Sequence, residues 1–471
     1  MSETLGVVNT YGGSPLNRLS WLRTSQAVLN AIIGLPQTRW IFFNRGQPLT
    51  ITAPNSPNEV LLYLGTEDIK SFLGPEPYFG QGQTPGDLIP SDHNEDSGEH
   101  SHHSPTHAAR HIGPRVVFAG LDDHDKDSAA SLPLAEFKDP VVAVQSLKGT
   151  PYFALDVAEL SISQEEIDQI LSSSLSKDGR TFRWSEPRSF LTTLDNNAAA
   201  IFGLARSMVD WNLRNRFCPG CGSPTYSMWG GWKISCTSLL PWAKNQGNLC
   251  PSGKGLQNYT HPRTDAVVIM IAIDETGDKV LLGRGRRFPG KFYSALAGFI
   301  EPGESFEDAV AREMWEEAGV RVWNVRYHSG QPWPYPANLM VGFYARADST
   351  KPVRVDLDNE LVDARWYTRD EVRAVLNHRA GTKFGNSDYK RLNEIVEGKK
   401  DGDQASATAA ATAFTPVEDD KAKASAPQVG SEVDEPPFRV PPSSAIAGVL
   451  IRDWVDRKIG FEPKPFQKMN L

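Results

Sequence analysis

Residues 298–320 read GFIEPGESFEDAVAREMWEEAGV and carry the most regular pattern in the chain. Within this stretch Ser305 is followed by Asp308, a spacing that approximates a capping box and predicts the start of a helix. Apolar residues then recur at helical spacing, so one face of the helix is expected to pack against a core. Gly319 is a typical C-terminal stop. We therefore expect a loop followed by one amphipathic helix.

Three carboxylates gather on this helix. Glu313, Glu316 and Glu317 stand at positions i, i+3 and i+4, so they lie on or beside one face. Crowding of like charge is unfavourable unless cations occupy the site, and Mg²⁺ or Mn²⁺ prefers oxygen ligands and bridges to phosphates. The plainer interpretation is a solvated acidic face, but the fixed spacing of the whole stretch argues against it.

The spacing G-x5-E-x7-R-E-U-x-E-E-x-G-U, where U is apolar, is matched by residues 298–320 without a gap. It resembles the Nudix box of hydrolases that act on nucleoside diphosphates linked to another group. The resemblance implies a Nudix fold, which is a mixed β-sheet between helices, and metal-dependent attack of water on a diphosphate. It also implies that Arg312 orients the acidic cluster by pairing with it. The residues expected to support the box are Gly298, Glu304, Arg312 and Gly319.

A proline-rich track follows the box, and residues 330–340 read GQPWPYPANLM. Prolines at alternate positions force an extended, rigid segment, on which Trp333 and Tyr335 could stack against a planar ring. The plainer alternative is a structural proline-rich loop. The track looks like the SQPWPFPxS signature of NADH pyrophosphatases, from which it departs at Gly330, Tyr335 and Asn338.

Three further segments are similar to the same family. Residues 261–265 fit the segment before the first Nudix strand, although His261 stands where a tyrosine is usual. Residues 358–366 fit a segment after the box, and residues 441–454 fit the closing helix.

The resemblance also implies which residues form the active site. The Mg²⁺ or Mn²⁺ ligands would be Glu313, Glu316, Glu317 and Glu360. The catalytic residues would be Glu317, Glu360 and Glu316, with Glu317 or Glu360 as the proton acceptor. The substrate-binding residues would be Ala297, Phe299, Gln331, Trp333, His261 and Ala447.

All four cysteines fall within residues 218–250. Cys218 and Cys221 form a tight CxxC turn, whereas Cys236 and Cys250 are widely spaced. Four thiolates brought together would hold one tetrahedral Zn²⁺ with no open position, which makes such a site structural. Free thiols and a redox pair are the alternatives. The clustering favours one structural zinc per chain, and a zinc-binding cysteine segment also precedes the Nudix unit in NADH pyrophosphatases.

The predicted fold class is α+β, with an N-terminal β-rich domain, a small four-cysteine zinc ribbon and a C-terminal Nudix fold. Two polar or low-complexity stretches cannot bury enough surface to offset their ordering entropy, so we expect them to be disordered. The expected boundaries are 1–213 for the N-terminal domain with an insertion at 80–112, 214–263 for the ribbon, 264–397 for the Nudix domain, 398–438 for the linker and 439–458 for the closing helix.

The insertion is rich in histidine, since seven of the ten histidines lie between His93 and His124. A histidine metal site is one interpretation. A solvated loop is favoured because no cysteine or apolar frame accompanies these side chains to pre-organise them as ligands.

The chain has 471 residues and a formal net charge of −8, so it lacks the overall basic charge of many nucleic-acid-binding proteins. A local basic patch at 284–287 could still contact RNA. The longest apolar run, 266–273, is far shorter than the ~20 residues that span a bilayer, and no signal peptide is recognisable. We expect no membrane partner and a cytoplasmic or peroxisomal location, since Met469-Asn470-Leu471 only partly matches a peroxisomal tripeptide.

The resemblance implies an enzyme that hydrolyses the diphosphate of NADH or NAD⁺ to a nicotinamide mononucleotide and AMP, acting as a homodimer. Removal of an NAD cap from RNA would be the same chemistry with a larger leaving group. A third interpretation is a non-catalytic Nudix module that senses a dinucleotide and docks a protein through the ribbon. The intact glutamates argue against this third interpretation.

Overall fold

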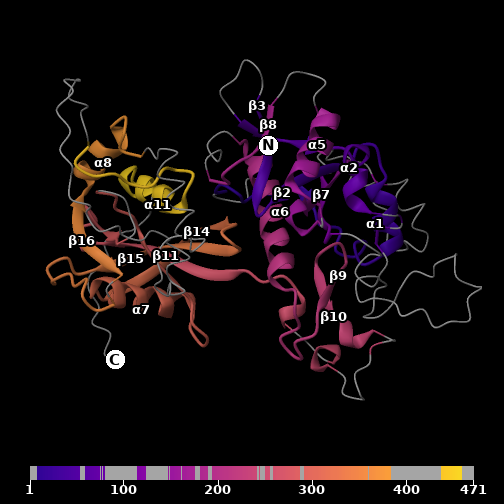
Figure 1. Ribbon diagram of the computed structural model, residues 1–471. Helices are drawn as coiled ribbons and strands as arrows, with labels where there is room; N and C mark the ends of the chain where they lie inside the picture. Colours follow the sequence, from indigo (N-terminus) through magenta and orange to yellow (C-terminus); the bar gives the residue numbers. More distant parts are fainter. Residues whose placement is uncertain are drawn as a thin grey trace, which may run out of the picture. The chain divides into compact units, whose positions relative to one another are not determined.

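The computed structural model divides the chain into two compact units, each with its own sheet and core (Figure 1). One unit is Gly13–Thr264, and the other joins Met1–Gly12 to Asp265–Leu471. The residues that the structure describes are 8–52, 59–74, 76, 78–79, 114–122, 147, 149–160, 162–175, 181–188, 194–240, 243, 250–254, 258–286, 291–358, 360–382 and 436–458.

The C-terminal unit is built on a six-stranded sheet of order β14-β15-β11-β12-β16, with β13 paired to β11. Its strands are β11 (Asp265–Ile273), β12 (Lys279–Gly285), β13 (Leu296–Phe299), β14 (Val322–Trp333), β15 (Asn338–Ala347) and β16 (Leu361–Thr368). Its helices are α7 (Phe306–Ala318), α8 (Arg369–Asn377) and α11 (Ile446–Val455). Strands β11 and β15 are parallel and the other neighbours are antiparallel, so the sheet is mixed.

Side chains of β11 alternate between the two faces of this sheet, as the pleat of a strand requires. Val268 and Met270 pack with the apolar face of α7. Ile269 and Ile271 pack with α8 and α11. Figure 1 shows α7 on one side of the sheet and α8 with α11 on the other. The strand is buried on both faces, which explains why its sequence is almost entirely apolar. The predicted mixed sheet between helices is confirmed.

The N-terminal unit is built on an eight-stranded sheet of order β1-β6-β7-β2-β3-β4, with β5 paired to β2 and β8 to β3. Its strands are β1 (Leu16–Asn17), β2 (Arg39–Asn44), β3 (Gln47–Thr52), β4 (Glu59–Leu61), β5 (Tyr63–Leu64), β6 (Val117–Asp122), β7 (Thr150–Asp156) and β8 (Thr181–Trp184). Its helices are α1 (Gln26–Ile33), α2 (Thr66–Leu73), α5 (Gln164–Leu175) and α6 (Asn196–Arg214). Trp40 of β2 stacks on Phe153 of β7 with ring centroids 5.1 Å apart, at the centre of an aromatic core. The predicted β-rich domain is confirmed.

A two-stranded hairpin of β9 (Thr225–Met228) and β10 (Lys233–Cys236) follows α6. Arg115 links β9, the first strand of this hairpin, to the end of α6. Its guanidinium donates to the carbonyl of Asn212 at 2.5 Å and to the carbonyl of Thr225 at 3.0 Å. The start of the segment that carries the cysteines is therefore fixed to α6.

The structure differs from the predicted boundaries at two points. Residues 8–12 lie with the C-terminal unit instead of the N-terminal domain, because Asn9 and Tyr11 hydrogen-bond to β14 and the segment after it. Phe438, predicted as the end of the linker, is buried with its ring centroid 4.4 Å from that of Tyr367. The sequence signal for this contact was the aromatic side chain of Phe438 within a polar segment.

Several predictions from the sequence concern residues that the structure does not describe. The insertion at 80–112 and the linker as far as 435 lie outside the described residues, and so do the histidines from His93 to His124 and the C-terminal tripeptide. None of the described helices is both long enough and apolar enough to cross a membrane.

Candidate functional site

Helix α7 is capped at both ends as the sequence predicts. The Ser305 hydroxyl accepts from the backbone N–H of Asp308, and the Asp308 carboxylate accepts from the backbone N–H of Ser305, which completes a capping box. At the other end Gly319 adopts the left-handed conformation with φ 65°. Its apolar face is buried against the sheet. The glutamates therefore project from a helix whose position is fixed.

Gly298 of β13 lies directly under a carboxylate of that helix. A Cβ atom at this position would stand 1.8 Å from Cδ of Glu313, so no side chain fits there while Glu313 keeps its place. The glycine is thus required by the close approach of the carboxylate to the strand, and the same approach leaves Glu313 only 5% exposed.

Arg312 connects the acidic residues of the box. Its guanidinium reaches Glu304 at 2.5 Å, Glu313 at 2.7 Å and Glu316 at 3.0 Å. It also donates to the carbonyl of Phe299 at 2.7 Å, which fixes the guanidinium to the end of β13. One cation therefore orients three carboxylates from the loop and the helix.

Glu317 is the most deeply buried member of the cluster. It is 4% exposed, and among the described residues its Oε1 atom has no hydrogen-bond partner. Burial and the nearby carboxylates of Glu313, Glu360 and Asp358 raise the pKa of Glu317 well above its usual value, although the backbone N–H of Ala297 donates to it. An unpartnered, buried carboxylate surrounded by like charge is costly without a counter-ion.

Burial also raises the pKa of Glu313 to about 7, against the opposing effect of Arg312. Glu316 is half exposed, and Glu360 lies close enough to raise the pKa of both buried glutamates. An all-carboxylate donor set with an orphaned oxygen fits a hard divalent cation such as Mg²⁺ or Mn²⁺. The glutamate oxygens do not converge on one point in this geometry, where Arg312 engages two of them.

Trp333 ends β14 and is half buried. Its ring meets that of Tyr335 edge-on at 5.3 Å and that of Tyr11 edge-on at 6.2 Å. Phe299 at the end of β13 is also half buried and packs on the same core. These two partly accessible rings remain candidates for a stacking contact.

Gln331, which the resemblance assigns to substrate binding, places its side chain between β14 and the start of α11. It is 1% exposed, and its amide donates to the carbonyl of Ser444 at 2.8 Å while its carbonyl oxygen accepts from the N–H of Ile446. A donation to the carbonyl of Thr10 completes its hydrogen bonds. The side chain therefore attaches the start of α11 to β14, and its role in substrate binding stays a prediction.

The remaining residues that were predicted to bind substrate belong to both units. Ala297 and Ala447 are both buried, and Ala447 packs in the core under α11. His261 is exposed and belongs to the N-terminal unit, where its ring lies 5.7 Å from that of Trp229.

Sequence reasoning missed the segment that supports Trp333. Asn9 donates to the Ser329 hydroxyl and to the Gly330 carbonyl, both at 2.9 Å. The buried hydroxyls of Tyr11 and Tyr335 form a 2.9 Å hydrogen bond. These partners are more than 300 positions apart in the sequence, so no local pattern could have paired them.

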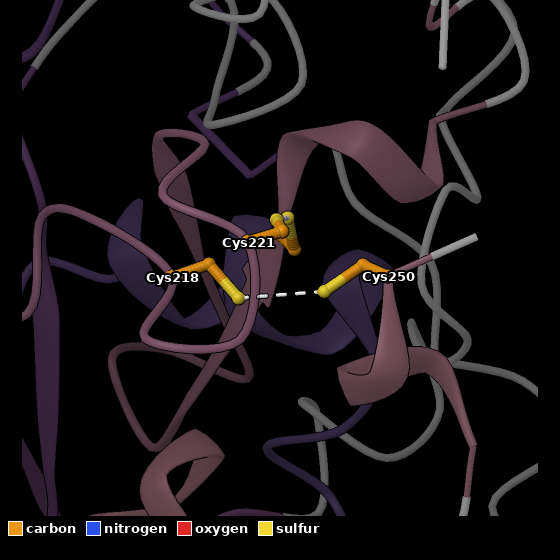
Figure 2. A group of neighbouring side chains, drawn as sticks. Cys218, Cys221 and Cys250 are labelled. Carbon is orange, nitrogen blue, oxygen red and sulfur yellow. Dashed lines mark hydrogen bonds between the residues drawn. The ribbon is translucent and has the colours of Figure 1, made fainter. Parts of the chain in front are cut away.

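The four cysteines converge on one point. Their Sγ atoms all lie within 4.8 Å of one another, and those of Cys218 and Cys250 are 3.5 Å apart. Figure 2 shows these two side chains pointing toward each other. Cys221 and Cys236 are 3.3 Å apart, so neither pair is a disulfide. This spacing suits four thiolates around one ion with bonds of about 2.3 Å. The cluster is compatible with a structural zinc site.

Two serines complete this cluster. Ser238 and Ser252 each follow a cysteine by two positions, and each hydroxyl lies 3.0 Å from the sulfur of that cysteine. The widely spaced second pair, Cys236 and Cys250, is thus built from two similar Cys-x-Ser turns. The repeated Cys-x-Ser spacing is the sequence signal that could have identified these turns.

Comparison with known proteins finds two matching families. The NUDIX domain matches residues 262–384, and the NADH pyrophosphatase-like rudimentary NUDIX domain matches residues 37–211. NAD-capped RNA hydrolase of Schizosaccharomyces pombe is 40% identical over 47% of this chain and 56% of its own length. NAD-capped RNA hydrolase NUDT12 of Homo sapiens is 46% identical over 55% of this chain and 51% of its own length. NAD-capped RNA hydrolase NPY1 of Saccharomyces cerevisiae is 28% identical over 79% of this chain and 88% of its own length.

The chain spans about half the length of the first two of these relatives. The two family matches cover the six-stranded sheet and all strands of the eight-stranded sheet except β1, and the NUDIX match contains the whole acidic cluster. The chain therefore carries a NUDIX domain at residues 262–384, which follows an NADH pyrophosphatase-like rudimentary NUDIX domain at residues 37–211.

Proposed function

We propose that this chain hydrolyses the diphosphate of NADH or NAD⁺ to a nicotinamide mononucleotide and AMP. The observation that carries the proposal is Glu317, which is buried beside Glu313 within a complete Nudix box and has an oxygen without a partner among the described residues. A structural helix would not keep such a carboxylate, because burial without a counter-ion costs stability. A site for cations and phosphates explains why it is there.

The cations would be held by Glu313, Glu316, Glu317 and Glu360. A bound Mg²⁺ or Mn²⁺ would supply charge to the two phosphates and lower the pKa of a water molecule. The protein residues position that chemistry. Arg312 keeps Glu313 and Glu316 oriented, and Gly298 leaves room for the Glu313 carboxylate. Glu317 or Glu360 would accept the proton of the attacking water.

Substrate recognition would use the ring of Trp333 and that of Phe299, which are both partly accessible and lie on the same core. Stacking is possible on any planar ring, whether a base or nicotinamide, and it adds binding energy without contact with the diphosphate. The four cysteines would hold one Zn²⁺ with a structural role, since no ligand position remains open. A homodimer and a cytoplasmic or peroxisomal location remain predictions.

A second candidate function is removal of an NAD cap from RNA. The observation that favours it is that the three relatives named above are described as NAD-capped RNA hydrolases. The bond broken would be the same diphosphate, so the acidic cluster would act in the same way. The substrates would differ only in the chain attached to the adenosine.

The test is an HPLC assay of the purified chain with Mg²⁺ or Mn²⁺ and NADH, NAD⁺, ADP-ribose or NAD-capped RNA. We expect AMP and the reduced mononucleotide from NADH. Trp333→Ala should raise KM for NADH and leave KM for a diphosphate without a nicotinamide ring little changed. A chain that binds NADH but releases no product with either cation would support the sensing module instead.

A further inference from the structure

The four cysteines divide into two pairs according to the distances between their sulfurs. The Sγ atoms of Cys221 and Cys236 are 3.3 Å apart, and those of Cys218 and Cys250 are 3.5 Å apart. Each pair joins one cysteine of the CxxC turn to one that directly precedes a short 3₁₀ turn. The two pairs are therefore built alike.

A serine hydroxyl accompanies each pair in the same way. The Ser238 hydroxyl lies 3.0 Å from the sulfur of Cys236 and 3.8 Å from that of Cys221. The same two distances separate the Ser252 hydroxyl from the sulfurs of the other pair. The neighbouring hydroxyls therefore give neither pair a reactivity that the other lacks.

The two pairs differ in their exposure to solvent. Cys221 is exposed, whereas the other three cysteines are each only 2% exposed. Gly222, which follows Cys221, has φ 75°, and a Cβ atom built on it would meet no described atom within 4 Å. The chain beside Cys221 therefore borders open space, and only this pair has a sulfur that solvent can reach.

Exposure decides which metal-binding cysteine meets an oxidant. A cysteine that binds a metal ion is a deprotonated thiolate, and thiolates are the form that peroxides oxidise. The susceptibility of a thiolate also rises with its exposure. A dissolved oxidant should therefore react with Cys221 before it reaches the buried sulfurs of Cys218, Cys236 and Cys250.

We propose that Cys221 is an oxidation site for small peroxides and that Cys236 then closes a disulfide with it. The proposal rests on the zinc site proposed above and is independent of the hydrolysis of NADH. With hydrogen peroxide, the Cys221 sulfur bonds to one oxygen and the O–O bond breaks. The other oxygen takes a proton from solvent and leaves as water, so that Cys221 becomes a sulfenic acid.

The second step uses the neighbouring sulfur. The Cys236 thiolate attacks the Cys221 sulfur, the S–S bond forms and the S–O bond breaks, and the oxygen leaves with a second proton from solvent as water. The two sulfurs lose two electrons, and these reduce the peroxide to two waters. The 3.3 Å between the sulfurs leaves about 1.3 Å to close before a disulfide bond of about 2.05 Å is formed.

The disulfide would remove two of the four thiolates from the zinc site. The two sulfurs that remain, those of Cys218 and Cys250, do not complete a tetrahedral site, so the ion should be released. Tyr259 packs against the three buried cysteines, and loss of the ion should therefore lower the unfolding midpoint of this unit. Peroxide would thus convert a stabilising metal site into a disulfide.

The test treats the zinc-loaded full chain with hydrogen peroxide in the absence of reductant. A chromophoric chelator measures the released zinc, and mass spectrometry of an unreduced digest identifies the disulfide. We expect about one zinc ion released for each peroxide consumed, because one disulfide takes up both oxidising equivalents. The digest should contain the Cys221–Cys236 peptide pair, and dithiothreitol with added Zn²⁺ should restore the zinc content.

Two histidine variants separate exposure from mere loss of a sulfur. Cys221→His keeps four possible zinc ligands but removes the exposed sulfur, so it should retain its zinc at peroxide doses that empty the unchanged chain. Cys250→His is the matched control, since it removes a buried sulfur from the other pair, and it should release zinc as fast as the unchanged chain.

Equal rates of zinc release from the two variants would overturn the proposal. A disulfide between Cys218 and Cys221 or between Cys218 and Cys250 would do the same, and so would an unchanged chain that keeps its zinc under peroxide. If the purified chain held no zinc, the proposed zinc site would fail, while the disulfide found in the digest would still decide where oxidation occurs. No step of the test uses NADH, so its outcome is separate from that of the proposed hydrolysis.

Discussion

The four cysteines and the glutamates of α7 are both clusters of potential metal ligands, yet the structure holds them in different ways. The sulfurs come from two turns and a hairpin and converge within 4.8 Å. The glutamates come from one helix, and Arg312 engages Glu313 and Glu316 while Glu317 keeps an oxygen without a described partner. The four sulfurs are positioned to share one ion, whereas the glutamate oxygens do not meet at one point.

This difference fits the two proposed roles, in which the cysteine site stabilises the fold and the glutamate site performs chemistry. Four thiolates around an ion leave no position for a substrate, so their binding energy becomes folding energy. Glutamates that are buried and crowded store an unfavourable interaction, which cations and phosphates would relieve when they bind. Substitutions in the two sites should therefore affect different measurements.

The largest expected effect is on stability at the cysteine site. Cys236→Ser should lower the zinc content below one per chain and the unfolding free energy by at least about 4 kcal/mol, because loss of a metal is among the few single changes of that size. This corresponds to about 8–16 °C in the unfolding midpoint. Metal analysis and calorimetry measure both quantities. Ser238→Ala, which leaves all four sulfurs in place, is the matched control, and a Cys236→Ser protein with unchanged zinc content would break the comparison.

The next effect is on catalysis at the glutamate site. Glu317→Gln keeps the shape of the side chain but removes one charge from the cluster. Loss of electrostatic stabilisation should lower kcat by about 10²–10³, or about 2.7–4 kcal/mol. The unfolding midpoint should stay the same or rise, since the variant removes a buried charge among like charges. Glu307→Gln, an exposed position on the same helix, should leave kcat unchanged. An active Glu317→Gln enzyme would show that the acidic helix is not the catalytic centre.

A smaller effect should follow from filling the space under Glu313. Gly298→Ala places a methyl group where the carboxylate now lies, so the helix or the strand must shift at a cost of about 1–3 kcal/mol. We expect both a lower unfolding midpoint and a lower kcat. Gly330→Ala is the control, because a Cβ atom there would meet no atom closer than 3.8 Å. Equal stability of the two alanine variants would contradict the close approach at Gly298.

The smallest effect concerns the segment that supports Trp333. Tyr11→Phe removes one buried hydrogen bond, that with the Tyr335 hydroxyl, which is worth about 0.5–1.5 kcal/mol. If the segment positions Trp333, KM for NADH should rise while kcat is kept. Tyr327→Phe, at a tyrosine that is 64% exposed, should change neither value. A fall in kcat with KM unchanged would show that this segment does not act through Trp333.

The sequence was sufficient for those features that depend on local spacing. The caps of α7 follow from Ser305, Asp308 and Gly319, and the shared face of the glutamates follows from the pitch of a helix. The apolar strand β11 and the clustered cysteines could likewise be recognised from neighbours in the chain. Each of these signals lies within a few tens of residues.

The tertiary structure alone decided which of these side chains are buried and what they meet. The unpartnered oxygen of Glu317, the structural bonds of Gln331 and the contact of Tyr11 with Tyr335 all join segments that lie far apart along the chain or depend on the packing of a helix on a sheet. Such contacts are set by how complete elements pack, and periodicity carries no information about the partner of a given residue. For this reason the acidic helix was predictable from its sequence, while the burial that gives its glutamates their raised pKa was not.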